Sequence, residues 1–401
     1  MAASTHARRS GTLFPQSSNS SGSADHDPRK VLVCGGAVVD CIVRPFDTTQ
    51  RGASHSSLPG EARVSLGGVG RNIAEVIARL GGSPSLLSAV GDDEPGRQLV
   101  EACRDIGVRV DTLIRSPKGR TATYTALLDG SGELVGAVAD MDVFNEVGAE
   151  LVGTAARGLP DLGLVVCDAN LQAAALEQVL ACSAEASVPA WFEPVSTAKA
   201  TRGRCTRPWH LISPNWDELL AMLGRPQRTR EDGAGHADWR PPTELMSAID
   251  EAFEHRLAEH LLVTLGPGGV LLASAPSSGA VAATALAPVQ ELDVERMLAG
   301  LAGAPSGVPP LRVRIEPLSS GHLWYRLVEP LTSVCDVTGA GDALLAGTAR
   351  AFCSGWPLER AVIAGLFCAH LTLFTSGAVA HFLTAELFYR LGSAVAHASR
   401  L

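Results

Sequence analysis

The chain has 401 residues, of which 46% are hydrophobic, and a formal net charge of −9 at pH 7. This length accommodates one large α/β domain or two smaller ones, and the acidic balance offers no broad positive field to a phosphate polymer, so we expect no nucleic-acid partner. No apolar run approaches the roughly 18 residues of a transmembrane helix, and no charged leader precedes an apolar stretch, so we expect no membrane partner.

The first 29 residues are rich in Ser, Gly and Ala, contain Arg8 and Arg9, and have no acid before Asp25. This composition cannot support a packed core and predicts a disordered tail; the alternative is an organelle transit peptide, which would also carry Arg and Ser and few acids. Nine cysteines without a CxxC pair fit a reducing compartment. We therefore expect a cytoplasmic protein, or a mitochondrial or other organellar one if the tail is a transit peptide.

From residue 30 onward, short apolar runs alternate with stretches of helical periodicity. In one such stretch, Ile73, Val76, Ile77 and Leu80 recur at helical spacing. The alternation predicts an α/β fold with a mainly parallel sheet covered by helices on both faces, and ligands bind at the carboxyl ends of the strands in such folds. The predicted buried strands are Val31–Cys34, Leu86–Val90, Leu164–Cys167, Ala190–Phe192, Leu211–Ser213 and Leu261–Leu265.

Three segments interrupt the alternation. Residues 119–140 contain two strand-like runs around the turn Asp129–Gly132, which predicts an antiparallel hairpin that projects from the main sheet as a lid. Residues 225–242 carry mixed charges, and residues 275–310 are rich in Ala, Pro and Gly. We expect both of these stretches to be mobile surface insertions.

The segment Asp336–Asp342 reads DVTGAGD and runs directly into an apolar helical pattern. A glycine-rich turn that opens a helix leaves several backbone N–H groups unpaired, and the helix dipole favours negative charge there. The turn is therefore a candidate anion site. Asp342 could accept the proton of an alcohol that attacks a phosphoryl group, although Asp is also favoured in this position as a capping residue.

A second glycine-rich motif, GGVGRNIA, occupies Gly67–Ala74. Together with DVTGAGD it closely resembles the paired signatures of the ribokinase-like (PfkB) carbohydrate kinases. The resemblance extends from about Val31 to Leu387. It also includes Gly35-Gly36 followed by Asp40, Gly91-Asp92-Asp93 with Gly96, Pro214-Asn215 with Glu218, and Thr264-Leu265-Gly266 with Gly269.

The resemblance implies one kinase domain over residues 30–401, with a three-layer α/β/α fold, a small β lid, and ATP and Mg²⁺ as cofactors. Asp342 would be the general base, and Gly339, Ala340 and Gly341 would present amides to the transferring phosphoryl group. The other implied roles are sugar binding by Asp40, Gly68 and Asn72, Mg²⁺ binding by Asn215 and Glu218, ATP binding by Thr264, Gly266 and Gly269 with Gly339 and Gly341, and a monovalent cation such as K⁺ near Asp336.

Within the family, three stretches resemble the pseudouridine kinases: the first motif with Arg71, the lid hairpin, and the segment Glu193–Lys199 preceded by Asp168–Leu171. This resemblance implies transfer of the ATP γ-phosphate to the 5′-hydroxyl of the free nucleoside. It adds Thr123, Asp140 and Lys199 as substrate-binding candidates, and a homodimer through the lid. The chain departs from many relatives at Val337, where Thr or Ser is usual, and in the stretch 275–310.

Alternatives remain open at this stage. Asp40 could be a turn residue, Asn72 a helix cap and Glu218 a solvated helix acid. The chain could also phosphorylate another nucleoside or a ketose, or be a catalytically silent relative that only binds a nucleoside. The eleven histidines are dispersed without a metal-binding spacing, so none receives a role.

Overall fold

The structure is a computed structural model. It describes residues 29–46, 57–228, 239–276, 289–300, 307–318, 320–329, 331 and 334–398. Apart from Arg29, the tail predicted at 1–29 lies outside the described residues, as does the middle of the stretch 225–242. Within the described ranges, no helix is both long and apolar enough to cross a membrane.

A ten-stranded sheet forms the centre of the fold, in the order β14-β15-β16-β13-β12-β11-β10-β9-β1-β4. The strands from β12 to β4 pair in parallel, whereas β13, β16, β15 and β14 extend the sheet in antiparallel pairs. The parallel strands are almost wholly buried, which is why they read as continuous apolar runs. Their bounds are β1 Lys30–Cys34, β4 Ser83–Leu87, β9 Leu162–Asp168, β10 Ala190–Glu193, β11 Trp209–Ile212 and β12 Ala258–Thr264; the antiparallel strands are β13 Val270–Ser274, β14 Val289–Leu292, β15 Leu311–Pro317 and β16 Leu323–Leu327.

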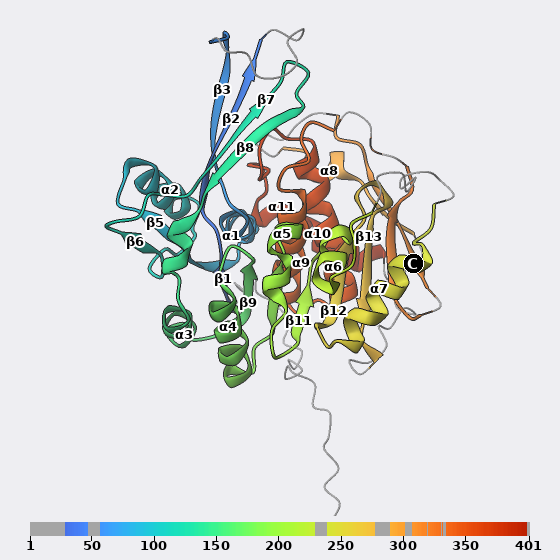
Figure 1. Ribbon diagram of the computed structural model, residues 1–401. Coiled ribbons are helices and arrows are strands. Elements are labelled where there is room, and N and C mark those ends of the chain that lie inside the picture. Colours follow the sequence, from blue (N-terminus) through green and yellow to red (C-terminus); the bar gives the residue numbers. More distant parts are fainter. Residues whose placement is uncertain are drawn as a thin grey trace, which may run out of the picture.

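Helices cover both faces of this sheet, and the two resulting cores confirm the predicted three layers (Figure 1). One core contains Ile73, Val76 and Ile77, the apolar residues predicted at helical spacing. The helices on that face are α1 Val69–Arg79, α2 Glu94–Asp105, α8 Val294–Leu298, α9 Ala340–Cys353, α10 Leu358–Leu373 and α11 Ala385–Ala398. The other face carries α3 Ala149–Arg157, α4 Ala173–Ala186, α5 Thr197–Ala200, α6 Trp216–Leu223 and α7 Thr243–Glu254; short 3₁₀ turns are η1 Asp142–Glu146, η2 Thr201–Gly203 and η3 Gly266–Gly268.

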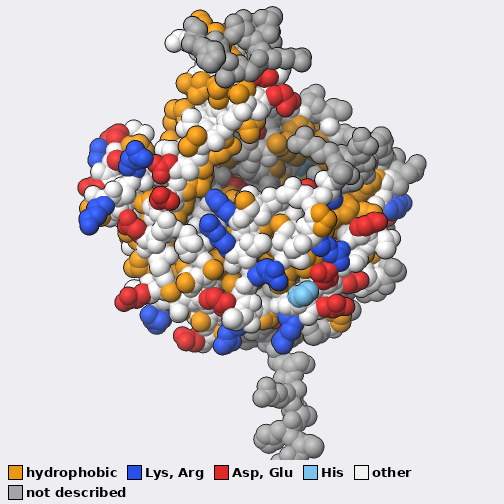
Figure 2. Space-filling model, in the orientation of Figure 1, with side chains coloured by type: hydrophobic (Ala, Val, Ile, Leu, Met, Phe, Trp, Pro, Cys, Tyr) orange, Lys and Arg blue, Asp and Glu red, His pale blue; other side chains and the backbone are white. Residues whose placement is uncertain are grey.

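A separate four-stranded sheet, the lid, projects from the body (Figure 1). Its order is β3-β2-β7-β8, with β7 Thr123–Leu128 and β8 Leu134–Asp140 lying in the segment predicted as a hairpin. The strands β2 Val38–Pro45 and β3 Gly60–Gly67 complete the sheet, and sequence analysis did not predict them. The reason is that β3 is largely exposed and lacks an apolar run, whereas β2 is only half-buried and its apolar run is interrupted by Asp40. Figure 2 shows the molecule hollowed between the lid and the body.

Two expectations from the sequence differ from the structure. The run Leu86–Val90 is not one strand, because the chain leaves the main sheet after β4 and forms β5 Ala89–Gly91, which pairs with β6 Ile114–Ser116. The stretch 275–310 is not wholly a surface insertion, because it contains β14 and α8. Val294 and Leu298 of α8 are buried in the core, although the Ala- and Pro-rich sequence around them obscures their apolar pattern.

Candidate active site

The turn before α9 has a conformation that requires glycine. Gly339 caps the helix with φ 77°, and a β-carbon there would overlap the carbonyl oxygen of Ala378. The N–H of Ala340 makes only a long bond, 3.4 Å, to the carbonyl oxygen of Val337. A β-carbon on Gly341 would meet no atom within 4 Å, so open space faces the first turn, where helix geometry leaves backbone N–H groups without intrahelical acceptors.

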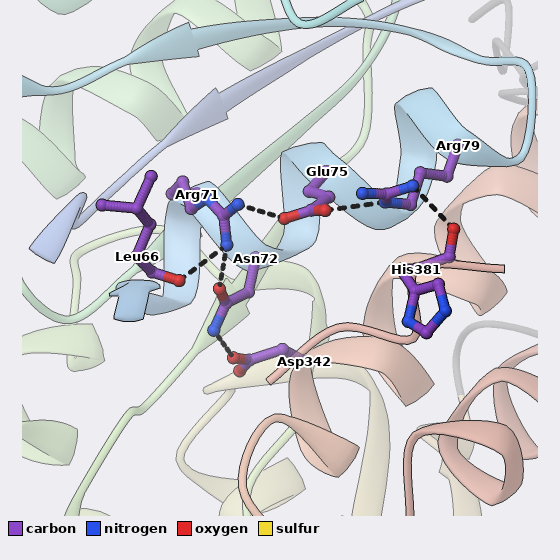
Figure 3. Close-up of polar contacts among 7 residues, drawn as sticks. All are labelled: Leu66, Arg71, Asn72, Glu75, Arg79, Asp342 and His381. Carbon is purple, nitrogen blue, oxygen red and sulfur yellow. Dashed lines mark hydrogen bonds and ion pairs between the residues drawn. The ribbon is translucent and has the colours of Figure 1, made fainter. Parts of the chain in front are cut away.

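Asp342 lies on this first turn and is buried, with 9% of its surface exposed. Its Oδ2 accepts a hydrogen bond of 2.8 Å from Nδ2 of Asn72, on the first turn of α1 (Figure 3). This bond joins the two glycine-rich motifs across 270 residues of sequence. The structure therefore brings the predicted base and a predicted substrate-binding residue into direct contact.

The electrostatic surroundings of Asp342 disfavour its charged form. Burial raises its pKa to about 7, and the negative charges of Asp168, Asp40 and Glu218 act in the same direction, whereas the bond from Asn72 lowers it. A carboxylate with a pKa near the working pH is suited to general-base chemistry, because it can both take up and release a proton.

Asp168, at the carboxyl end of β9, holds the amino-terminal motif in place. It is fully buried, and its Oδ2 accepts bonds of 2.8 Å from the backbone N–H groups of Gly36 and Gly70. Its Oδ1 accepts a third bond of 2.8 Å from the N–H of Asn170. Three backbone donors compensate for the burial of one carboxylate, and they connect β9 to the loop after β1 and to the start of α1.

Gly68 and Asp40 lie at the junction of α1 and the lid. Gly68 has φ 93°, and a β-carbon there would lie 2.5 Å from the carbonyl oxygen of Gly36. Asp40, in β2, packs its carboxylate over Gly67, where a β-carbon would overlap it. Burial raises the pKa of Asp40 to about 6, although the positive charge of Arg71 opposes the shift.

The substrate-binding candidates Thr123, Asp140 and Lys199 have different neighbours in the structure. Thr123 and Asp140 face each other in the β7–β8 register, but the carboxylate of Asp140 pairs with exposed Arg120 at 2.8 Å. Lys199 donates from Nζ to Oδ1 of buried Asn170 at 2.6 Å, and burial lowers its pKa. The lysine is thereby connected to the Asp168 segment.

Asn215 and Glu218 form a reciprocal cap at the start of α6. The N–H of Glu218 donates to Oδ1 of Asn215, and the N–H of Asn215 donates to Oε2 of Glu218, both at 2.8 Å. Glu218 is 5% exposed, so it is not the solvated helix acid of the alternative interpretation. Burial raises its pKa, and burial together with the charges of Glu218 and Asp342 raises that of Glu193. These are oxygen donors crowded with negative charge, a donor set that fits Mg²⁺.

The candidate ATP loop follows β12. The N–H of Thr264 donates to the carbonyl oxygen of Pro214, so the loop lies beside Asn215. A β-carbon on Gly269 would overlap the carbonyl oxygen of Tyr325, whereas one on Gly266 would meet nothing within 4 Å. The open space at Gly266 leaves room for a phosphate to approach the backbone. The carboxylate of the remaining candidate, Asp336, accepts a bond of 2.8 Å from the N–H of Thr338.

Sequence reasoning gave no role to several polar residues at this site. Asp168 and Asn170 were noticed only as part of a resemblance, and Glu193 likewise. A usable signal for Asp168 was present, because it is an acid that ends an otherwise apolar buried strand. For Arg71 and Glu75 the sequence signal was weaker. It consists of opposite charges four residues apart on a helix whose neighbouring positions are apolar.

The sequence matches the model of a known protein family. The model described as "pfkB family carbohydrate kinase" matches residues 29–294 and 320–385. The chain is 28% identical over 350 residues to the pseudouridine kinase of Escherichia coli strain K12, which covers 86% of this chain and 90% of that protein. It is also 28% identical over 362 residues to the pseudouridine kinase of Arabidopsis thaliana, covering 84% and 89% of the two chains.

Solved structures show the same fold. The ribokinase of Giardia lamblia superposes with a TM-score of 0.65 at 14% identity, over 91% of this chain and 99% of that one. Arabidopsis thaliana ribokinase, solved with ribose and ATP, gives a TM-score of 0.62 at 19% identity, over 91% and 98%. With the family model matched over most of its length, this chain belongs to the pfkB family of carbohydrate kinases, phosphotransferases that act on an alcohol acceptor.

Proposed function

We propose that this chain transfers the γ-phosphoryl group of ATP to the 5′-hydroxyl of pseudouridine, giving pseudouridine 5′-phosphate and ADP. The observation that carries the proposal is the bond from Asn72 to Asp342, because it unites both motifs in one buried site. The choice of acceptor is supported by the likeness to two pseudouridine kinases over more than four-fifths of the chain.

In the proposed reaction, ionised Asp342 accepts the proton of the 5′-hydroxyl while the hydroxyl oxygen forms a bond to the γ-phosphorus. The bond from that phosphorus to the β–γ bridging oxygen breaks, and its electron pair leaves with ADP. The side-chain NH₂ group of Asn72 holds the carboxylate of Asp342 in position. The backbone amides of Gly339, Ala340 and Gly341 stabilise negative charge on the transferring group from the helix N-terminus.

The acceptor would lie between α1 and the lid. Asp40, Asn72 and the backbone of Gly68 would bind the sugar hydroxyls, because a carboxylate accepts from diols and glycine permits close approach. Lys199, with Thr123 and Asp140 from the lid, would contact the nucleoside, and the lid would exclude water from the reacting groups.

ATP would bind along Thr264, Gly266 and Gly269, with its phosphates reaching Gly339 and Gly341, where open space faces Gly266 and Gly341. Asn215 and Glu218 would hold Mg²⁺ through its water shell, and Asp336 would lie near a monovalent cation such as K⁺. When bound, Mg²⁺ neutralises charge on the phosphates.

We also propose that the lid forms a homodimer. Its exposed apolar residues include Val64, 64% exposed, Leu134, 58%, and Val138, 71%. Figure 2 shows hydrophobic side chains on the surface of the lid. Val64 lies on β3, and Leu134 and Val138 lie on β8; these are the two edge strands of the sheet, and the register places Val64 and Val138 in one row across it. A second copy of the same sheet would cover this apolar surface.

The acceptor is tested by ADP release from ATP-Mg²⁺ with pseudouridine, uridine, adenosine, ribose and fructose offered separately. We expect selective turnover of pseudouridine, because the chain resembles two pseudouridine kinases over more than four-fifths of its length. Turnover of another compound would refute the assigned acceptor and keep the kinase chemistry, and no turnover of any would favour a binding protein.

Replacing Asp342 by Asn removes the proton acceptor and leaves the turn before it intact. We expect kcat to fall by about 10²–10⁴-fold, the usual contribution of a general base, with nucleotide binding retained in a calorimetric titration. Asp105→Asn, an exposed acid at the end of α2, is the matched control. Undiminished turnover in Asp342→Asn would rule out the assigned role.

The rate should depend on pH through the same carboxylate. Because Asp342 must be ionised to accept a proton and its pKa is raised to about 7, kcat/KM should fall about tenfold per pH unit below that value. Initial rates between pH 5.5 and 8.5, at saturating ATP-Mg²⁺, measure this limb. A profile that is flat down to pH 5.5 would contradict the shifted carboxylate.

The dimer is tested by sedimentation velocity at micromolar concentration. Val138→Glu would place a charge in the proposed apolar contact, so we expect it to convert the wild-type dimer into a monomer. Leu151→Glu, at an exposed position of α3 outside the lid, should leave the dimer unchanged. A wild-type protein that sediments as a monomer would remove this part of the proposal.

A further inference from the structure

A chain of polar contacts runs along α1 and ends at Asp342 (Figure 3). Arg71 donates from Nη1 to the carbonyl oxygen of Leu66 at 2.9 Å and to Oδ1 of Asn72 at 3.2 Å. Asn72 in turn donates from Nδ2 to Asp342. Leu66 belongs to β3, so one guanidinium connects the lid to the side chain that holds the proposed base.

The two ends of the Asn72 amide are chemically different, and their neighbours discriminate between them. A guanidinium has donors only, so it can face only the amide oxygen, and an ionised carboxylate accepts only, so it can face only the NH₂ group. Rotating the amide by half a turn would place oxygen against Asp342 and NH₂ against Arg71, which are two repulsive contacts. Arg71 therefore selects the orientation in which Asn72 donates to the base.

The guanidinium is itself held in place by charge. Arg71 is 8% exposed, and its Nη2 pairs with Glu75, which is 4% exposed. Glu75 also pairs with Arg79 at 2.6 Å, and Nη1 of Arg79 donates to the carbonyl oxygen of His381 at 2.8 Å. A buried cation needs such a partner, and Glu75 fixes the Arg71 fork in the direction of Asn72.

We propose that Arg71 is a positioning residue for phosphoryl transfer: it orients the Asn72 amide toward Asp342 and connects that orientation to strand β3 of the lid. The proposal rests on the proposed role of Asp342 as the base. It assigns Arg71 no contact with substrate. Its effect reaches the reacting hydroxyl through Asn72 and Asp342.

This role makes a specific prediction about proton affinity. The bond from Asn72 lowers the pKa of Asp342, so loss of the oriented amide should raise that pKa and move the acid limb of the rate profile to higher pH. Other charged groups facing Asp342 are Asp168, Asp40, Glu218 and Glu193. Of these, Asp40 is itself affected by Arg71, whose positive charge lowers the pKa of Asp40. Asp40 and Cys103 also lie near the charge of Arg71.

The test compares Arg71→Met with Arg79→Met. The first removes the donor to Asn72, whereas the second removes only the outer partner of Glu75, so it controls for loss of a cation from the same ion-pair chain. We expect Arg71→Met to lower kcat about tenfold or more, the cost of a lost charge-assisted hydrogen bond, with the KM for ATP within about twofold and the acid limb displaced to higher pH. Arg79→Met should match the wild type in kcat, in the KM for ATP and in the position of the acid limb.

A double-mutant cycle with Asn72→Ala separates positioning from stability. If Arg71 acts through Asn72, then Arg71→Met should lower kcat by less than about twofold further in the Asn72→Ala background. Full additivity would overturn the proposal, as would equal effects of Arg71→Met and Arg79→Met. If Arg71→Met fails to fold by circular dichroism, Arg71→Lys serves instead, because an ammonium can pair with Glu75 but lacks the planar fork that also reaches Leu66 and Asn72.

A measurement made without any acceptor substrate keeps the test of Arg71 separate from the test of the proposed function. The ¹³C shift of the Asp342 carboxyl, identified by its absence in Asp342→Asn, reports its titration directly. We expect a higher midpoint in Arg71→Met and an unchanged one in Arg79→Met. If wild type does not phosphorylate pseudouridine, the proposed acceptor fails, yet the titration still decides the inference about Arg71; an unchanged midpoint in Arg71→Met would overturn it.

Discussion

The buried carboxylate of Asp168 is the contact on which the geometry of the site depends. An ionised group in apolar surroundings is tolerated only when its oxygens are satisfied, and here the N–H groups of Gly36, Gly70 and Asn170 satisfy them. These donors come from three different parts of the chain. By binding them at one point, Asp168 sets where α1 begins relative to the central sheet, and thus where Asn72 lies relative to α9.

Much of this arrangement could be predicted from local sequence. Buried parallel strands are apolar throughout and alternate with amphipathic helices, so the layered fold follows from periodicity alone. The glycine-rich turns could be predicted as well, because Gly68 and Gly339 have positive φ and backbone neighbours that leave no room for a side chain. Asp342 became a candidate because it follows a glycine-rich turn that opens a helix, and Asn72 became one through the family resemblance. The structure places the two side chains in contact.

The remainder depends on contacts between distant segments, which local patterns do not encode. Strand β3 lacks an apolar run because it is largely exposed, and Asp40 interrupts the apolar run of β2. These segments are strands because β2 pairs with β3 on one side and with β7 on the other. The burial of Arg71 was only weakly indicated by Glu75 four residues later, since a charged residue on a helix is usually solvated. The ion pair of Asp140 with Arg120 could not be inferred, because the position of Arg120 depends on how the hairpin joins the body.

The bond between Asn72 and Asp342 also bears on how the protein is made. The two side chains are 270 residues apart, so a ribosome adding about 5–20 residues per second needs on the order of tens of seconds to synthesise the second after the first. During that interval the apolar face of α1 has no α9 to cover it, although β1, β4 and β9 can already pair. The nascent chain therefore passes through a stage in which half of the sheet is present without catalytic competence, and this stage is where chaperone protection would matter most.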